Sequence, residues 1–226
     1  LDPIDAHHLI CPLAIAALLL LWYRFIAARA GAATGLATLL ALLLYPRFFG
    51  HALNNIKDAP TLLIVYAALL AWIRALETER GAPVLIGAIL TGIGFATKIN
   101  AVWPIAFFVM VFFGSRLPRL ARGATTPLRF AAALLLAPAL LIAAYLAASP
   151  ILWLDGFTRF AEHARYALIE SVRVEGRDAF SWEPLQNLLW VTPPLYLPLA
   201  VVGAFSLLRR RCLRGPVAWM LGLMLV

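Results

Sequence analysis

The sequence predicts an all-α fold: a polytopic transmembrane helical bundle of about eight spans, with interfacial helices on the external side. Three observations lead to this prediction. Of the 226 residues, 63% are hydrophobic and 13% are charged, whereas a soluble domain is roughly half apolar and about a quarter charged. The apolar residues form runs that approach bilayer-spanning length. Arg and Lys are concentrated in alternate connections between those runs.

Composition excludes several other classes of protein. The mean hydropathy of +0.89 is too high for a disordered chain. The two cysteines, Cys11 and Cys212, are too few for a disulfide-stabilised scaffold and need not pair. The formal charge of +8 does not indicate a nucleic-acid-binding protein, because the basic residues are dispersed between apolar runs instead of forming one face. We therefore interpret the charge as membrane topology and expect no nucleic-acid partner.

Each expected helix corresponds to one apolar run. A helix needs roughly 20 apolar residues to cross the hydrocarbon core, with a lower limit near 17, and polar residues at its ends can snorkel. The runs 82–97 and 101–114 are short enough for two tight spans or one re-entrant excursion, and we favour two spans. In chain order the expected spans are residues 9–28, 30–45, 59–73, 82–97, 101–114, 130–148 and 188–208, with an eighth from Pro216.

All spans belong to a single transmembrane domain, residues 1–226. The chain begins at Leu1 without Met and stops at Val226 within an apolar run, so we expect a fragment that is open at both ends. Close helix packing is expected at the small residues of the fourth run, which include Gly87, Gly92 and Gly94.

The distribution of basic residues orients the bundle, because Lys and Arg are enriched in short cytoplasmic connections. One set of short connections holds only Arg47, Lys57 and Lys98. The long external loop 149–187 is left out of the comparison, since long loops cross the membrane largely regardless of charge. The opposite, arginine-rich set is expected in the cytoplasm and comprises Arg24, Arg29, Arg74, Arg80, Arg116, Arg119, Arg122, Arg129, Arg209, Arg210, Arg211 and Arg214.

The residues capable of chemistry gather on the external side, so we expect any active site to face outward. The sequence contains no P-loop, no Gly-rich dinucleotide fingerprint and no zinc-type Cys and His spacing. A nucleotide-driven enzyme or pump is therefore not expected.

The strongest local signal is the segment 46–60. If its first part is helical, the polar residues recur at steps of three and four and form one stripe, with apolar residues on the other flank. Such a stripe offers hydrogen-bond donors and positive charge to the phosphate of a lipid head group, and a carboxylate to a sugar hydroxyl or a partner cation. A plain interfacial anchor is the alternative interpretation. The candidate binding residues are Arg47, His51, Asn54, Asn55 and Lys57, and the supporting carboxylate is Asp58.

Lys98 and Asn100 form the second signal. A lysine between two strongly apolar runs is costly in lipid unless it pairs or reaches water. We therefore predict that Lys98 lies close to Asp58 and that both side chains line an outward-open cavity. The alternative is a snorkelling turn without chemistry. Asn100 is a further candidate binding residue.

The external loop 149–187 is expected to form interfacial helices, with Trp153 and Trp182 at headgroup depth. His163 is interpreted as a solvated surface histidine. The apolar stripe of the first helix is Phe157, Phe160, Ala164, Leu168 and Val172.

A cluster of metal-ligating residue types precedes the first span: Asp2, Asp5, His7 and His8. Adjacent histidines point apart on a helix, and few further ligands lie nearby in the sequence. We interpret the cluster as a solvated cap and assign no metal ligand. No cofactor is expected, and a divalent metal stays an open alternative.

Together these segments resemble the multi-pass GT-C glycosyltransferases, in the branch of protein O-mannosyltransferases and aminoarabinose transferases called glycosyltransferase family 39. The resemblance covers most of the chain, and the stretch from His51 to Asp58 is its distinctive part. It is carried by DAHH at residues 5–8, PRFFGHALNNIKDAP at 46–60, GIGFATKIN at 92–100 and WVTPP at 190–194, after a long external loop.

The resemblance implies an inverting transfer of a hexosyl or pentosyl group. The donor would be a polyprenyl-phosphate-linked sugar and the acceptor a hydroxyl of a lipid, glycan or protein at the external face of a bacterial inner membrane. In the family an acidic residue in the first external loop is the general base. That loop would precede Leu1, which leaves Asp58 a supporting role. Arg47, Lys57 and Lys98 fit capture of the donor phosphate.

Two other classes stay open. A multi-pass secondary transporter would place charged or broken-helix sites near mid-membrane and show repeated halves, and the sequence shows neither a convincing repeat nor a mid-span acid. A non-catalytic membrane assembly subunit would have no reason to gather the polar residues of 46–60.

Overall fold

The computed structural model describes residues 3–45, 48, 50, 58–98, 103–120, 126–150 and 152–165. Every regular element within these residues is a helix, which confirms the predicted all-α class there. The helices are α1 (Pro3–Ala30), α2 (Ala32–Leu43), α4 (Asp58–Thr78), α5 (Gly81–Thr97), α6 (Trp103–Leu120), α7 (Leu128–Ala148) and α8 (Leu152–Arg165).

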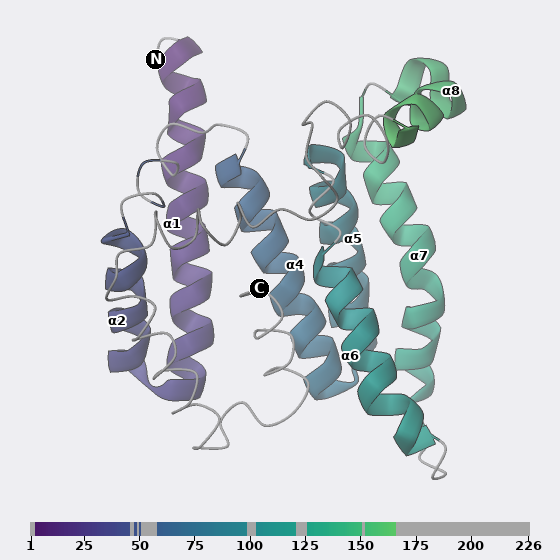
Figure 1. The fold of residues 1–226 in the computed structure, drawn as a ribbon, viewed down its shortest axis with the longest axis horizontal. Coiled ribbons are helices and arrows are strands. Elements are labelled where there is room, and N and C mark those ends of the chain that lie inside the picture. Colours follow the sequence, from purple (N-terminus) through teal and green to yellow (C-terminus); the bar gives the residue numbers. More distant parts are fainter. Residues whose placement is uncertain are drawn as a thin grey trace, which may run out of the picture.

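Helices α1, α2 and α4 to α7 run alternately down and up along one bundle axis (Figure 1). The first residues of α1, the start of α4 and the ends of α5 and α7 lie at the upper end, which we call the polar end. The α1–α2 and α4–α5 turns and the start of α7 lie at the opposite, arginine-rich end, which carries Arg29, Arg80 and Arg129. The alternation expected from the arginine pattern is therefore confirmed for the described residues.

Within the described residues, three helices are long and apolar enough to cross a membrane: Leu9–Ala30, Asp58–Thr78 and Leu128–Ala148. The 21 residues of α7 extend about 31 Å, against a hydrocarbon core of about 30 Å. Shorter apolar helices lie at the second, fourth and fifth predicted spans: Ala32–Leu43, Gly81–Thr97 and Pro104–Gly114. The predicted spans at 188–208 and from Pro216 lie outside the described residues.

The surface of α7 also suits a lipid environment. Leu128 and Leu135 are 84% and 85% exposed, and Leu136 and Ile142 are exposed beside them. A soluble protein rarely presents apolar side chains contiguously, whereas a bilayer accommodates them without cost. Long apolar helices with outward-facing leucines are the features of an integral membrane protein.

Helices α1 and α2 form an antiparallel hairpin around Gly31. Its φ of 90° lies in the region that favours glycine, and its N–H donates to the Ala27 carbonyl at 3.0 Å. A Cβ on Gly35 of α2 would lie 2.9 Å from a ring carbon of Tyr23 on α1. The missing side chains at these two glycines therefore let α2 turn back and pack directly on α1.

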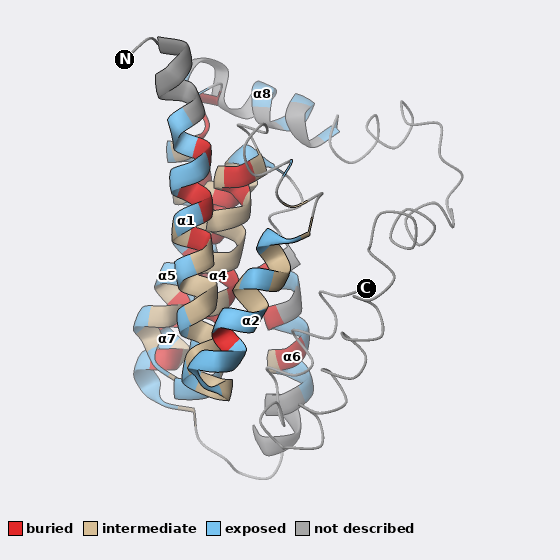
Figure 2. Cartoon of the chain, turned by 90° about the vertical axis from the view of Figure 1, so that its left-hand side faces the viewer, coloured by how far each residue is buried: buried red, intermediate tan, exposed pale blue. Residues whose placement is uncertain are grey.

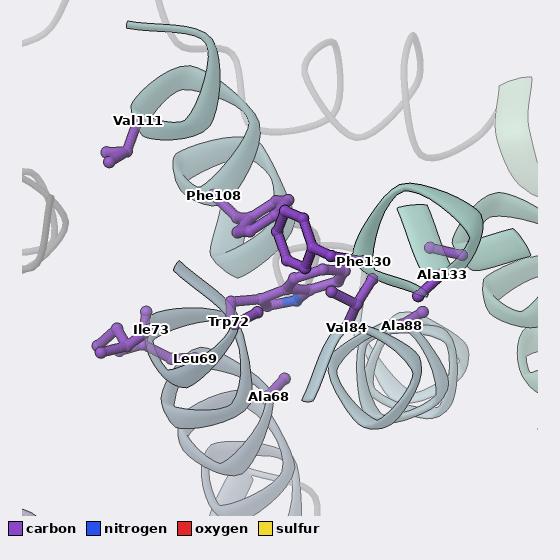
Figure 3. Packing of buried hydrophobic residues seen from close by; sticks show 12 residues of the cluster. Ala68, Leu69, Trp72, Ile73, Val84, Ala88, Phe108, Val111, Phe130 and Ala133 are labelled. Carbon is purple, nitrogen blue, oxygen red and sulfur yellow. The ribbon is translucent and has the colours of Figure 1, made fainter. Parts of the chain in front are cut away.

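The main core is centred on Trp72 of α4 (Figure 3). Its ring lies 4.3 Å, centroid to centroid, from that of Phe108 on α6, and Phe130 of α7 is fully buried in the same cluster. The indole Nε1 donates to Thr91 Oγ1 of α5 at 3.0 Å. Thr91 in turn donates to the Gly87 carbonyl at 2.7 Å, so both buried polar groups are satisfied within the helix packing.

Helix α5 packs between α4 and α7, and its glycines make the close contacts. A Cβ on Gly87 would lie 2.8 Å from the Trp72 ring, and one on Gly92 would meet the Leu141 carbonyl of α7. Gly94 is also buried. Close packing at these glycines was predicted, and the contacts of Gly87 and Gly92 confirm it.

Helix α8 lies across the polar end of the bundle, at a steep angle to α7 (Figure 2). Its first turn is anchored by Trp153, whose Nε1 donates to the Leu146 carbonyl at 2.8 Å while the side chain stays 66% exposed. A helix was expected here, and 152–165 is helical. Its interfacial placement stays a prediction, which the orientation across the bundle end favours. Trp182, Leu168 and Val172 lie outside the described residues.

Candidate functional site

The candidate site is built on an ion pair at the polar end of the bundle. Lys98 Nζ donates to Asp58 Oδ1 at 2.6 Å, although the two residues are 40 positions apart in the chain. The prediction that these two side chains lie close together is therefore confirmed. Their side chains are 51% and 41% exposed, so the pair is open to solvent or to a ligand.

The antiparallel arrangement of α4 and α5 explains why the two charges meet. Asp58 is the first residue of α4, and Lys98 directly follows the last residue of α5, where its N–H donates to the Gly94 carbonyl at 2.9 Å. A carboxylate is stabilised at a helix N-terminus and a cation at a helix C-terminus. The pair thus complements both helix dipoles at the point where the two ends lie side by side.

Two threonines extend the pair into a polar cluster. Thr61, one turn after Asp58, is buried and donates from Oγ1 to Thr97 Oγ1 at 3.1 Å. Thr97 Oγ1 donates to the Gly94 carbonyl at 2.6 Å. These bonds tie the start of α4 to the end of α5 beneath the ion pair. We call Asp58, Thr61, Thr97 and Lys98 the α4–α5 polar cluster.

Sequence reasoning did not single out Thr61 or Thr97. The spacing of Thr61 three residues after Asp58 places both on one helix face, and Thr97 is adjacent to Lys98. This spacing was the signal in the sequence that could have identified the two threonines. A single threonine in an apolar run is common, however, and only the helix pairing shows that the two hydroxyls meet.

The other predicted binding residues cannot be placed beside the cluster. Arg47, His51, Asn54, Asn55, Lys57 and Asn100 lie outside the described residues. Phe48, on the expected apolar flank of the segment 46–60, is described and packs against a cluster that contains Cys11 and Ile15 of α1 and Ala59 of α4. The segment therefore comes close to the start of α4 at Phe48. The predicted outward-open cavity stays a prediction, because most of the residues that would wall it are outside the described set.

The chemistry available to the cluster follows from its donors. A lysine ammonium has three N–H donors, and the contact with Asp58 uses one of them. The remaining N–H groups can donate to an anionic oxygen such as that of a phosphate. The neighbouring carboxylate limits rotation of the lysine and holds its charge at the bundle end. The cluster is therefore able to bind an oxyanion next to a hydrogen-bond-accepting carboxylate.

A metal centre is not apparent within the part of the chain that the structure describes, where no three His, Cys, Asp or Glu residues gather in one place. The side chains of Asp2, Asp5, His7 and His8 fall outside that part. The alternative of a divalent metal accordingly stays open.

No family model, curated protein or solved structure matches this chain. The resemblance to the GT-C glycosyltransferases stays a prediction from the sequence motifs.

Proposed function

We propose that the chain is part of a membrane glycosyltransferase of the GT-C type, which moves a sugar from a polyprenyl-phosphate donor to a hydroxyl acceptor at the external face. The observation that carries the proposal is the half-exposed Asp58–Lys98 pair at the end of the bundle. The segments that flank this pair in the sequence, 46–57 and 99–100, carry the candidate phosphate-binding cations Arg47 and Lys57 and the amides of Asn54, Asn55 and Asn100.

In this proposal Lys98, with Lys57 and Arg47, neutralises the phosphate of the donor lipid. The acceptor hydroxyl oxygen attacks the anomeric carbon, the bond from that carbon to the phosphate oxygen breaks, and the polyprenyl phosphate leaves with the electron pair. The configuration inverts because the attack is a single displacement. Cations at the phosphate stabilise the charge that develops on the leaving oxygen. Asp58 orients a sugar hydroxyl and holds Lys98, while an acidic residue such as the family uses takes the proton of the acceptor hydroxyl as general base.

The position of the pair favours this proposal over a secondary transporter. Transporter sites lie near the bilayer midplane, at breaks in helices. Asp58 and Lys98 instead stand at the terminus of one continuous helix and directly after another. A lipid-linked donor presents its phosphate at headgroup depth, and in this proposal the start of α4 and the end of α5 lie at that depth.

The test is transfer kinetics with the full-length parent protein in liposomes and a polyprenyl-phosphate-linked sugar. Lys98→Gln and Lys57→Ala each remove one charge-assisted contact to phosphate, which lowers kcat/KM for the donor roughly tenfold. Lys98→Arg keeps the charge and should retain more activity than Lys98→Gln. Parental kinetics in both charge-removing variants would contradict the proposal. So would a parent that transports a small solute but transfers no sugar.

A further inference from the structure

The second feature of the bundle is a cavity at its arginine-rich end, opposite the α4–α5 polar cluster. It has a volume of about 830 Å³ and lies between α1, α4 and the start of α5. Binding pockets for small molecules have volumes of roughly 300 to 1,000 Å³, so this one is large enough for a sizeable part of a lipid. We call it the basal cavity.

The walls of the basal cavity are mainly apolar. Leu21 of α1, Leu70 of α4 and Ile86 of α5 face it, together with small residues that include Ala28 and Ala71. An apolar space of this size between membrane-facing helices is unfavourable when it is empty, because its lining loses packing contacts. Hydrocarbon chains are the most abundant apolar material beside such helices.

The charged residues that line the cavity are mostly basic. Three arginines line it, Arg24, Arg29 and Arg74, against one carboxylate, that of Glu77. Arg29 Nη2 donates to both carboxylate oxygens of Glu77, at 2.7 and 2.8 Å, and its guanidinium carbon lies 3.8 Å from the Phe25 ring centroid. Arg29 is thereby neutralised and fixed in place.

The charges of Arg24 and Arg74 are not neutralised in this way. Neither makes an ion pair with another described residue, and both are exposed. Arg24 lies six residues before the end of α1 and Arg74 four before the end of α4, which is about 9 and 6 Å inside the helix ends. The enrichment of basic residues in cytoplasmic connections explains arginines between the helices. Arg24 and Arg74 instead lie within α1 and α4 and line the same cavity. A guanidinium at that depth needs an anionic partner or must snorkel.

We infer that the basal cavity binds an anionic phospholipid, with its phosphate between Arg24 and Arg74 and an acyl chain along Leu21, Leu70 and Ile86. Guanidinium groups hold phosphate oxygens with paired, charge-assisted hydrogen bonds. Basic pockets between transmembrane helices on the cytoplasmic side are a recognised place for anionic head groups. The site is at the other end of the bundle from the polar cluster, so the inference does not depend on the proposed function.

The experiment measures lipid binding by native mass spectrometry of the purified full chain in detergent. The probes are palmitoyl-oleoyl phosphatidylglycerol and palmitoyl-oleoyl phosphatidylcholine. The parent should bind one phosphatidylglycerol molecule at least about tenfold more tightly than phosphatidylcholine. The double variant Arg24→Gln with Arg74→Gln should lose about tenfold or more of that affinity. The matched control is Arg80→Gln with Arg129→Gln, which removes the same charge from exposed arginines at the same end and should change affinity less than about twofold.

A blocking variant tests the cavity itself. Ala28→Phe adds a ring to the cavity wall from an exposed position on α1, retains every charge, and should abolish binding of phosphatidylglycerol without loss of helical content. Equal binding of the two lipids, equal losses in the double variant and its control, or unchanged binding in Ala28→Phe would overturn the inference. It would also be overturned if a cysteine at position 28 formed a disulfide in high yield with one in the segment 188–208, because the chain itself would then fill the cavity.

Discussion

Replacing Thr91 with valine tests the core interaction of the bundle. Thr91 Oγ1 accepts the indole N–H of Trp72 at 3.0 Å, and the two side chains are both 1% exposed. Valine has nearly the same shape as threonine, so the substitution leaves no cavity. It removes the acceptor, and the Trp72 N–H remains buried without a partner.

The expected cost follows from that orphaned donor. In water-soluble proteins a buried donor left unsatisfied costs about 1 to 3 kcal/mol. Side-chain hydrogen bonds between membrane helices have measured contributions of about 0.6 kcal/mol on average and up to about 1.7. Since both groups here are fully buried, we expect Thr91→Val to lower the free energy of unfolding by about 1 to 1.7 kcal/mol.

The assay is reversible unfolding in mixed detergent micelles, followed by helical circular dichroism. The matched control is Thr34→Val on α2, whose hydroxyl donates to the Ala30 carbonyl at an exposed position and should change stability by less than about 0.5 kcal/mol. In a double-mutant cycle with Trp72→Phe, the loss caused by Thr91→Val should shrink, because phenylalanine has no donor to orphan. Equal effects of Thr91→Val and Thr34→Val, or strict additivity in the cycle, would refute the reasoning.

The remaining predictions concern helix packing and topology. Gly92→Leu should prevent α5 from seating on the Leu141 backbone and sharply reduce the yield of folded protein, whereas Gly114→Ala, where a Cβ meets nothing within 4 Å, should leave yield and unfolding unchanged. Normal folding of the Gly92 variant would show that α5 and α7 do not pack as described. Single cysteines at Trp153 and Arg80 should react with an impermeant maleimide from opposite sides of intact membranes, with position 153 labelled from outside. Labelling of both positions from one side would contradict the alternating topology.

The positions of the helices could be predicted from the sequence because apolar runs and arginine-rich turns are local signals. The ends of the helices were predicted less accurately than their positions. The expected span at 101–114 continues as α6 to Leu120. Hydropathy marks where a chain leaves lipid, and a helix can continue beyond that point. A helix can also be shorter than its apolar run: in the run 30–45 the helix is confined to Ala32–Leu43.

The contact between Asp58 and Lys98 was predictable because an unpaired lysine at the edge of lipid is costly and few acids are available to pair with it. The Trp72–Thr91 bond was not, since it depends on how α4 and α5 are rotated against each other. The basal cavity was also missed. The arginines that line it were interpreted only as topological markers, and nothing in the one-dimensional pattern shows that Arg24 and Arg74 face the same space.

The most direct test of the central claim compares sugar transfer after the two ion pairs of the bundle are broken separately. The full-length parent is assayed with a polyprenyl-phosphate-linked sugar, and each rate is divided by the amount of folded protein. Asp58→Asn disrupts the pair at the polar end, and Glu77→Gln disrupts the Arg29–Glu77 pair at the arginine-rich end. We predict a loss of roughly tenfold or more for Asp58→Asn and a nearly parental rate for Glu77→Gln. Equal rates for the two variants would contradict the assignment of the polar end as the site of transfer.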